Sequence, residues 1–352
     1  MPDADGAPAS AAIVDVLAAQ SGMSSGHVLL ADIGGTNARF ALADVTAPMP
    51  LLADSIRIAP VDAFGSLADA ARHYLHDTGA QPARGVFAVA GRVDGDSARM
   101  TNHPWVVSAE RVRNALGLEA VQLVNDFVAQ SMAVLLLGEN DTVAIGAPAD
   151  VATDAGSRTF AVLGPGTGLG VGALLARHGH HYPLATEGGH ASFAPGTPEE
   201  VAILERLSAY YGRVSNERVV SGGGLVNLHR ALSEIAGLDP GPLLPEDITA
   251  RAAEGDRRCM RAIDVFCAAF GAIAGDVVLT LGAWDGVYLS GGMVPLLLPA
   301  LQHSGFRQRF EGKGRYAPAM ARVPTLAVVH PNPGLLGTAA IATGERAAGV
   351  AS

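Results

Sequence analysis

The sequence predicts an α/β protein with two lobes and a central cleft. Its 352 residues exceed the size at which one hydrophobic core usually stops growing, so two lobes are the first expectation. A unit of strand, glycine loop and strand occurs at 27–45 and again at 159–175, which indicates an internal duplication with one copy in each lobe. Helical and strand patterns fill the rest of the chain, as they do in α/β folds.

The secondary-structure elements follow from the apolar pattern. From His27 onward, the runs VLLADI and ARFALADV flank Gly34 and Gly35 and predict two antiparallel strands joined by a tight turn. Before the second copy of this unit, the pattern predicts a helix and two strands, at 65–77, 86–91 and 121–124. After it, helices predominate, at 198–211, 224–236 and 256–281. A late strand, GVYLSGG, precedes a glycine-rich C-terminal helix that is expected to cross back to the first lobe.

These elements divide the chain into three parts. Residues 1–26 are small and polar and are expected to form a flexible N-terminal extension, with Met23 as an alternative translation start. Residues 27–136 together with 331–352 are expected to form a small α/β domain. Residues 137–330 are expected to form a large α/β domain.

Charge and cysteine content narrow the class of function. A formal charge of −10, with basic residues that do not cluster, argues against a nucleic-acid groove but leaves a nucleotide possible, because backbone amides and a cation can hold phosphates. Cys259 and Cys267 fit neither a disulfide framework nor a zinc pattern. The N-terminus lacks a signal pattern, and no uninterrupted apolar run approaches about 18 residues. A cytoplasmic protein without a membrane partner is expected.

The two glycine loops are candidate phosphate sites. In the first, Asp32 ends a strand, Gly34 and Gly35 admit a ligand close to the backbone, and Thr36 and Asn37 follow with polar groups. A phosphate with its Mg²⁺ fits this pattern, and so does an ordinary hairpin turn. The loop is not a P-loop, because no Lys-Ser/Thr pair follows the glycines.

The second loop, GPGTGLG, carries Gly166, Thr167 and Gly168 at its centre. Its glycine spacing differs from the GxGxxG dinucleotide fingerprint, and a strand rather than a helix follows it. Both features count against a dehydrogenase. Together with the first loop, the second would clamp the two ends of a triphosphate.

Asn125 and Asp126 end a predicted strand, where the chemistry of open α/β sheets is found. A carboxylate there can accept the proton of an alcohol that attacks a phosphoryl group, which makes Asp126 the general-base candidate. Taken alone, an Asp that opens a helix is more simply an N-cap.

Carboxylate and imidazole groups flank two glycines in Glu187–Gly188–Gly189–His190, so both side chains can turn to one side of a tight loop. Such groups read neighbouring sugar hydroxyls, although a metal pair or a plain turn is also possible. Further glycines precede a helix at 222–224, where an anion would fit, and follow a strand at Gly291 and Gly292, where a flat base would fit. Close packing is the alternative for both.

Six segments in order, LLADIGGTNARFAL, LVNDFVAQSMAV, GPGTGLGVG, EGGHASFAP, ERVVSGGGLVNL and VYLSGGM, together resemble the bacterial glucokinase family of the actin, hexokinase and heat-shock chaperone superfamily. The resemblance runs from about His27 to Gly344. It implies a two-lobed actin-like ATPase fold of the ribonuclease H-like kind and a homodimer. It also implies transfer of the γ-phosphoryl group of ATP to the 6-hydroxyl of D-glucose, the first step of glycolysis.

The resemblance also implies a role for each matching residue. Asp126 is the base, and the other glucose ligands are Asn125, Glu187, His190 and Glu217, the last of which no pattern singled out. Asp32 is expected near Mg²⁺, held through water, while Thr36 and Thr167 lie near the transferred phosphoryl group. The two loops serve as the ATP clamps and Gly291–Gly292 as the adenosine turn. Related repressor and open-reading-frame kinases carry a cysteine-rich zinc motif after the EGGH-like segment; ASFAPGTPEE has no cysteine, so no structural zinc is expected.

Other functions stay open at this point. A kinase for fructose, mannose or an N-acetylated hexosamine would keep both loops and Asp126 but change the sugar-facing residues. A non-catalytic sugar sensor on the same fold is disfavoured by Asp126 and by the lack of a DNA-binding segment. Polyphosphate is an alternative donor to ATP. Because water competes with the sugar as acceptor, the lobes are expected to close on glucose, and scattering without compaction would contradict this.

Overall fold

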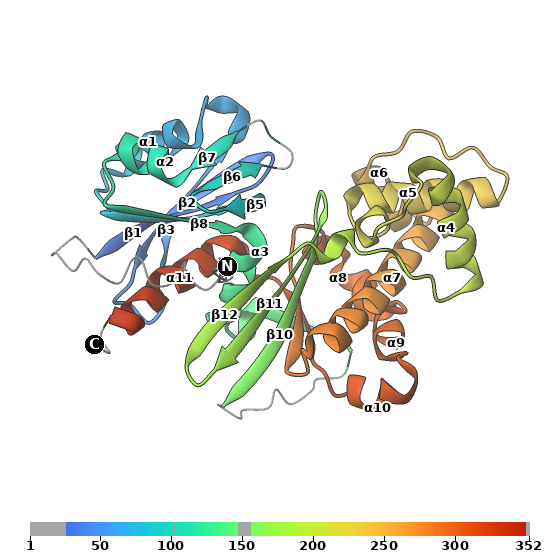
Figure 1. The fold of residues 1–352 in the computed structure, drawn as a ribbon. Helices are drawn as coiled ribbons and strands as arrows, with labels where there is room; N and C mark the ends of the chain where they lie inside the picture. Colours follow the sequence, from blue (N-terminus) through green and yellow to red (C-terminus); the bar gives the residue numbers. More distant parts are fainter. Residues whose placement is uncertain (1–25, 101–102, 104, 147–155, 350–352) are drawn as a thin grey trace, which may run out of the picture. The chain divides into compact units, whose positions relative to one another are not determined.

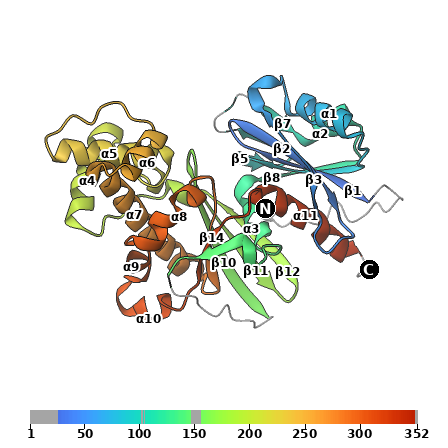
Figure 2. The same ribbon diagram turned by 180° about the vertical axis from the view of Figure 1, so that it is seen from behind.

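The computed structural model of the chain describes residues 26–100, 103, 105–146 and 156–349. They form two compact units: unit 1 is the chain up to Leu136 together with the segment from Asn332, and unit 2 is Leu137–Pro331. Each unit has its own large sheet and its own hydrophobic core (Figures 1 and 2). Apart from Gly26, the extension expected at 1–26, with the alternative start at Met23, lies outside the described residues.

Unit 1 contains two sheets. Its strands are β1 His27–Ile33, β2 Asn37–Asp44, β3 Leu51–Pro60, β4 Arg84–Val89, β5 Gly91–Asp94, β6 Ser97–Met100, β7 Val106–Ser108 and β8 Ala120–Asn125. The large sheet has the order β3-β2-β1-β4-β8, and the small one β5-β6-β7. The helices are η1 Val61–Ala63, α1 Leu67–Thr78, α2 Ala109–Leu116, α3 Asp126–Ala133 and α11 Pro333–Gly349.

Helices cover both faces of the large sheet of unit 1. Helices α1 and α2 lie together on one side, and α3 and α11 lie on the other (Figures 1 and 2). Phe40 of β2 stacks on Tyr74 of α1 with 5.6 Å between ring centroids. Strands β1, β4 and β8 run parallel, and their register places Asp32, Ala88 and Val124 side by side. Asp32 and the residues that follow Val124 therefore lie at the same edge of one sheet.

Helices α3 and α11 approach so closely that only glycine fits at position 337. A Cβ on Gly337 would lie 1.7 Å from the carbonyl oxygen of Ala129. We expect Gly337→Ala to destabilise the protein by more than about 3 kcal/mol, because the two helix backbones must separate. Gly344 lies on the same helix, α11, but is exposed, and a Cβ there meets nothing within 4 Å; Gly344→Ala is expected to stabilise the protein by roughly 0.5–1 kcal/mol. Urea unfolding measures both, and equal stability of the two variants would contradict this packing.

Unit 2 contains one six-stranded sheet and most of the helices. Its strands are β9 Thr142–Ala144, β10 Ser157–Pro165, β11 Leu169–Arg177, β12 His180–Thr186, β13 Gly286–Leu289 and β14 Thr325–Val328. The sheet order is β12-β11-β10-β13-β14-β9. The longer helices are α4 Pro198–Tyr211, α5 Gly222–Ile235, α6 Pro245–Ala253, α7 Arg257–Leu281 and α8 Met293–His303. The shorter ones are η2 Glu139–Asp141, η3 Gly188–His190, η4 Asn216–Arg218, α9 Phe306–Glu311, η5 Gly314–Tyr316 and α10 Ala317–Met320.

The two large sheets repeat one topology, which confirms the predicted duplication. In unit 1 the antiparallel strands β1, β2 and β3 are followed by β4 and β8 parallel to β1. In unit 2 the antiparallel strands β10, β11 and β12 are followed by β13 and β14 parallel to β10. In each copy a glycine loop joins the first two strands.

Helix α7 is the central helix of unit 2, with α5 and α6 packed around its beginning (Figures 1 and 2). Among the described helices it is the one long and apolar enough to cross a membrane by length and composition, but 72% of its most apolar window is buried within the unit. Its N-cap is Asp256, and Gly282, at φ 66°, ends it. Because most of its apolar window is buried, α7 is a core helix of unit 2.

Two elements of unit 2 contain proline, and the sequence patterns did not predict them. Strand β12 contains Pro183, which is tolerated because the strand lies at the sheet edge. Helix α6 starts at Pro245, and proline is favoured at the first position of a helix. The glycine- and proline-rich segment before it has the pattern of a loop, so no helix was predicted there. In unit 1 the helix after Asp126 is shorter than its apolar sequence suggests and ends at Ala133.

Candidate active site

The first glycine loop joins β1 to β2 in unit 1. The Gly34 N–H donates to the Asn37 carbonyl at 2.9 Å, which closes a tight turn through Gly35 and Thr36. The Val61 N–H donates to the Thr36 carbonyl at 3.0 Å and holds the turn against the start of η1. The Thr36 side chain is exposed, so its hydroxyl lies at the accessible tip of the loop.

Asp32 occupies a narrow site before this loop, against the first turn of α11. Its side chain is 20% exposed, and its Oδ2 lies 3.7 Å from the Arg39 guanidinium. Burial raises the pKa of Asp32, and Arg39 lowers it only in part. A Cβ on Gly334 would lie 2.5 Å from Asp32 Cγ, so glycine is what lets α11 approach the carboxylate. No local pattern in the sequence indicates this contact, because it joins opposite ends of the chain.

Asn125 and Asp126 lie at the junction of β8 and α3, as predicted. The N-cap is Asn125: its Oδ1 accepts from Phe127 N at 2.9 Å and from Val128 N at 3.3 Å, and its Nδ2 donates to the Gly91 carbonyl at 3.0 Å. Asp126 is the first helical residue, half-buried, and its Oδ1 accepts from Phe127 N at 3.0 Å. The carboxylate therefore stands at a helix N-terminus, where negative charge is stabilised, without serving as the cap.

The second glycine loop joins β10 to β11 in unit 2, and several predicted motifs meet around it. The Gly166 N–H donates to the Gly168 carbonyl at 2.8 Å, and Thr167 is exposed at the tip. The Gly222 N–H, at the start of α5, donates to the Gly166 carbonyl at 2.8 Å. The glycines at 222–224 thus hold the helix start against the loop.

Glu217 reaches the same loop from η4. Its Oε2 accepts from Leu169 N at 3.1 Å. A Cβ on Gly168 would lie 2.4 Å from that oxygen, so the carboxylate can occupy its place only because residue 168 has no side chain. Sequence patterns missed Glu217, since the contact links residues 48 positions apart and leaves no local signal.

Glu187 is the N-cap of η3 and His190 is its last residue, and η3 packs on β11, where the second loop ends. A Cβ on the buried Gly189 would lie 2.0 Å from the Leu169 carbonyl. The side chains of Glu187 and His190 are 69% and 56% exposed, with Oε2 and Nε2 4.0 Å apart. The two side chains therefore lie on one side of the turn, as predicted. Arg213 Nη1 donates to the His190 carbonyl at 2.8 Å, which links the turn to the segment after α4.

Gly291 and Gly292 follow β13 and approach the second loop from another side. Gly291 has φ 91°, and a Cβ on it would lie 2.8 Å from the Pro165 carbonyl at the end of β10. Gly292 precedes the first turn of α8. Packing therefore accounts for Gly291, while the adenosine role of the pair stays a prediction.

A cavity of about 430 Å³ opens beside the second loop, wholly within unit 2. The polar side chains that line it belong to Thr167, Tyr211, Glu217, Arg218, Ser221, Asn227 and Arg230. Arg230 Nε is buried and has no hydrogen-bond partner in the described part of the chain. Leu243, Leu244 and Pro245 add an apolar wall that the sequence did not indicate.

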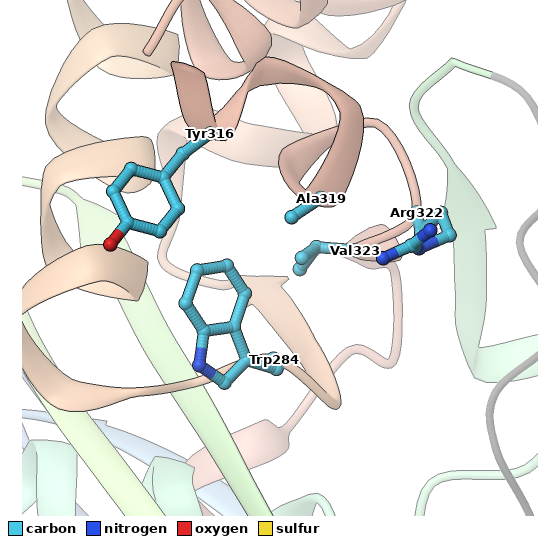
Figure 3. A pocket seen from close by; sticks show the side chains of 5 residues that line it. All are labelled: Trp284, Tyr316, Ala319, Arg322 and Val323. Atoms are coloured by element: carbon cyan, nitrogen blue, oxygen red, sulfur yellow. The ribbon is translucent and has the colours of Figure 1, made fainter. Parts of the chain in front are cut away.

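A second cavity, of about 230 Å³, lies away from these motifs (Figure 3). Trp284 and Tyr316 face each other there, with ring centroids 6.5 Å apart and planes inclined by 27°. Trp284 precedes β13, whereas Gly291 follows it. This cavity is therefore at the opposite end of β13 from the glycine pair, and we assign it no part in the site.

The predicted residues form two sets. In unit 1 they are the loop at 34–37 with Asp32, and Asn125–Asp126 at the same sheet edge. In unit 2 Glu217 contacts the loop at 166–168, Gly291 packs on Pro165 just before it, and the turn that carries Glu187 and His190 packs on Leu169 just after it. Among the described residues, no group of three or more His, Cys, Asp or Glu side chains is placed to hold a metal ion.

Comparison with known proteins gives consistent matches over most of the chain. The family described as Glucokinase matches residues 29–345. A glucokinase of Stenotrophomonas maltophilia is 63% identical over 320 residues, covering 91% of this chain and 96% of the relative. A glucokinase of Xanthomonas campestris pv. campestris is 62% identical over 325 residues, covering 91% and 96%.

Solved structures agree. A glucokinase from an Antarctic psychrotroph has a TM-score of 0.79 at 33% identity, covering 90% of this chain and 99% of that one. A Balamuthia mandrillaris glucokinase, solved with glucose, has a TM-score of 0.72 at 21% identity, covering 90% and 93%, and shows likeness of fold alone. The repeated sheets are thus those of a two-lobed actin-like kinase fold. With a family match across nearly its whole length and relatives more than 60% identical, the chain belongs to the glucokinase family.

Proposed function

We propose that this protein transfers the γ-phosphoryl group of ATP to the 6-hydroxyl of D-glucose, giving glucose 6-phosphate and ADP. Family membership supports the reaction, and the carboxylate of Asp126 at the carboxyl end of β8 is the observation that carries its chemistry. Substrate choice is supported by the relatives named glucokinase that are more than 60% identical to this chain; of the structures that share its fold, the Balamuthia enzyme was solved with glucose and a Streptomyces griseus glucokinase with glucose and AMPPNP.

Asp126 acts as the general base. Its carboxylate takes the proton of the glucose 6-hydroxyl as that oxygen attacks the γ-phosphorus, and the bond to the bridging oxygen of ADP breaks. Because Asn125 caps α3 and is anchored to Gly91, the helix start that carries Asp126 has a fixed direction. The protein's contribution is thus to place the base and to orient the attacking hydroxyl.

Glucose hydroxyls are bound by Asn125, Glu187, His190 and Glu217. The Glu217 carboxylate uses Oε2 for Leu169 N and retains acceptor positions for sugar hydroxyls. Glu187 and His190 are exposed and lie on one side of their turn; the Glu187 carboxylate can accept from a hydroxyl, and the His190 imidazole can accept from or donate to one. The Asn125 amide uses one N–H for Gly91 and has a second N–H for the sugar.

The nucleotide is held by the two glycine loops. Thr36 and Thr167 occupy the exposed tips and contact the transferred phosphoryl group, while the backbone at Gly34, Gly35, Asn37, Gly166 and Gly168 approaches the phosphates. The cavity beside Thr167 has room and polar groups for the nucleoside. Gly291 and Gly292 contact the adenosine from the end of β13.

The residues around Asp32 fit a Mg²⁺ ion bound through water. Mg²⁺ in phosphoryl-transfer sites is held by one or two carboxylates, waters and substrate phosphates, and it neutralises charge on the phosphates. Asp32 offers such a carboxylate in a narrow, partly exposed site beside the first loop. Burial disfavours the ionised form of Asp32, and the charge of Arg39 offsets this only in part. A bound cation would therefore stabilise the carboxylate further.

Asp32→Asn is expected to lower kcat roughly 10²- to 10³-fold and yet to stabilise the ligand-free protein at neutral pH. Burial raises the pKa of Asp32 above its unfolded value, so folding stability falls as the pH rises from the unfolded pKa to the folded pKa, and the loss is complete above the folded pKa. At low pH, where Asp32 is protonated, the advantage of the variant should disappear. Thermal unfolding from pH 4 to 8 measures this. An advantage that does not shrink towards low pH would contradict the buried-carboxylate account.

Coupled assays of the wild type with ATP and Mg²⁺ test the proposed function. Turnover should be fastest on glucose, ahead of fructose, mannose and N-acetylglucosamine. Faster turnover of another hexose would move the substrate assignment, and no turnover of any would favour a sugar sensor. Polyphosphate in place of ATP tests the donor.

We further propose a cytoplasmic homodimer without structural zinc. In it, residues 27–136 with 331–352 would act as the small domain and residues 137–330 as the large one. The family resemblance supports the homodimer and the absence of zinc, the lack of a signal pattern supports the location, and the order of the secondary-structure elements supports the domain bounds. Light scattering on the purified protein and elemental analysis test the dimer and the zinc.

A further inference from the structure

We infer that the buried ion pair between Glu200 and Arg309 is a positioning device for the sugar-binding turn at 187–190, an inference that rests on the proposed function. The pair fixes the segment that follows His190 to the helical core of unit 2. The turn is thereby held in place before glucose binds.

One carboxylate oxygen joins the loop to the core. Glu200 Oε2 accepts from Gly196 N at 2.6 Å and from Arg309 Nη2 at 2.9 Å, and the Glu200 side chain is only 3% exposed. A Cβ on Gly196 would lie 2.4 Å from Arg309 Nη2, so the guanidinium lies directly against the loop backbone. A buried carboxylate with both partners is a strongly directional contact, unlike a surface pair.

Both partners come from fixed elements. Glu200 lies in the first turn of α4, where its N–H donates to the Thr197 hydroxyl at 3.1 Å. Arg309 lies on α9, whose backbone touches α7: a Cβ on Gly271 would lie 2.0 Å from the Phe306 carbonyl, and one on Gly275 2.6 Å from the Phe310 carbonyl. The Arg309 side chain therefore projects from an anchored helix.

From Gly196 the loop leads back to His190 along a short backbone ladder. Phe193 is 6% exposed, and its N–H donates to the Val214 carbonyl at 3.0 Å. The Ala191 carbonyl accepts from Asn216 N at 2.8 Å, one residue before Glu217. These two hydrogen bonds pair the segment after His190 with the segment before Glu217, so both proposed sugar ligands lie at the same end of the paired segments. The ion pair fixes the other end, at Gly196.

The exposed side chains of the turn make this support necessary. His190 and Glu187 are 56% and 69% exposed, so little side-chain packing holds them. Their positions depend on the backbone beneath them, and loss of the anchor at Gly196 would let that backbone move. A shift of about 1 Å in such a ligand set is enough to cost binding or turnover.

Glu200→Gln tests this by removing the charge while keeping size and an acceptor for Gly196 N. The KM for glucose should rise about tenfold, with the KM for ATP and kcat at saturating glucose changed less than about twofold. Arg309→Lys keeps the charge but loses the planar guanidinium, so its glucose KM should be intermediate. If Glu200→Gln fails to fold, Arg309→Lys alone tests the inference.

The neighbouring residue supplies the matched control. Glu199, beside Glu200 on α4, pairs with Arg261 of α7, with Nε to Oε1 at 3.2 Å, but the two side chains are 35% and 53% exposed. Glu199→Gln should leave both KM values unchanged, as expected for a surface pair. In a His190→Ala background, Glu200→Gln should raise the glucose KM by less than it does alone, because both act through one turn.

The outcomes separate the two proposals. If the wild type does not phosphorylate glucose, the proposed function fails and this inference falls with it. If the wild type is active but Glu200→Gln keeps the wild-type glucose KM, or lowers the unfolding temperature and kcat with no selective effect on glucose, the pair is structural only and the inference is wrong while the function stands.

Discussion

Replacing Asp126 by asparagine should lower kcat for glucose phosphorylation by about 10²- to 10⁴-fold while both substrates still bind. An amide of the same size cannot accept the proton of the 6-hydroxyl, so the attacking oxygen must lose it to water or to phosphate. The fold should survive, because Asn125 rather than Asp126 caps α3 and is itself held by Gly91.

Steady-state kinetics with ATP and Mg²⁺ measure the loss, and calorimetric titration with glucose measures binding. Asp69→Asn is the matched control in the same unit: Asp69 also lies in the first turn of a helix, and its carboxylate bonds to Ser66 and Arg72 at the surface. Full activity is expected there. If Asp126→Asn retained more than about a tenth of the wild-type kcat, another group would have to be the base.

The sequence could predict those parts of the fold whose signal is local. The helix expected at 198–211 is observed as Pro198–Tyr211, because Thr197 caps it and proline opens it. The strand before Gly291 and the junction that carries Asp126 were found for the same reason. Apolar runs, caps and glycines mark them within a few residues.

Contacts between distant segments could not be predicted. Glu217 and Leu169 are 48 positions apart, and Glu200 and Arg309 are 109 apart. Neither pair leaves a periodicity or a cap in its own segment. Gly334 looks like any helix glycine until Asp32 is found beside it. The chemistry-bearing residues were therefore easier to name than the residues that hold them in place.

Gly168→Ala should lower kcat/KM for glucose roughly 10- to 100-fold with little loss of stability. The new Cβ would lie 2.4 Å from Glu217 Oε2, and nothing else within 4 Å surrounds it but the same side chain. Because that oxygen ends a flexible side chain, the fold can accept the methyl group by moving the carboxylate away. The move breaks the bond to Leu169 N and displaces a proposed glucose ligand.

Kinetics at varied glucose and at varied ATP test this, with unfolding temperature as the stability measure. Gly156→Ala, just before β10 at the far end of the same hairpin, meets nothing within 4 Å and should behave as the wild type. Combined with Glu217→Ala, the Gly168 substitution should add almost no further loss in glucose affinity, since the ligand it displaces is already absent. If the losses in glucose affinity of the two substitutions were fully additive, the Gly168 substitution would act through the loop and not through Glu217. The position of the Glu217 carboxylate beside residue 168 would then not affect glucose binding.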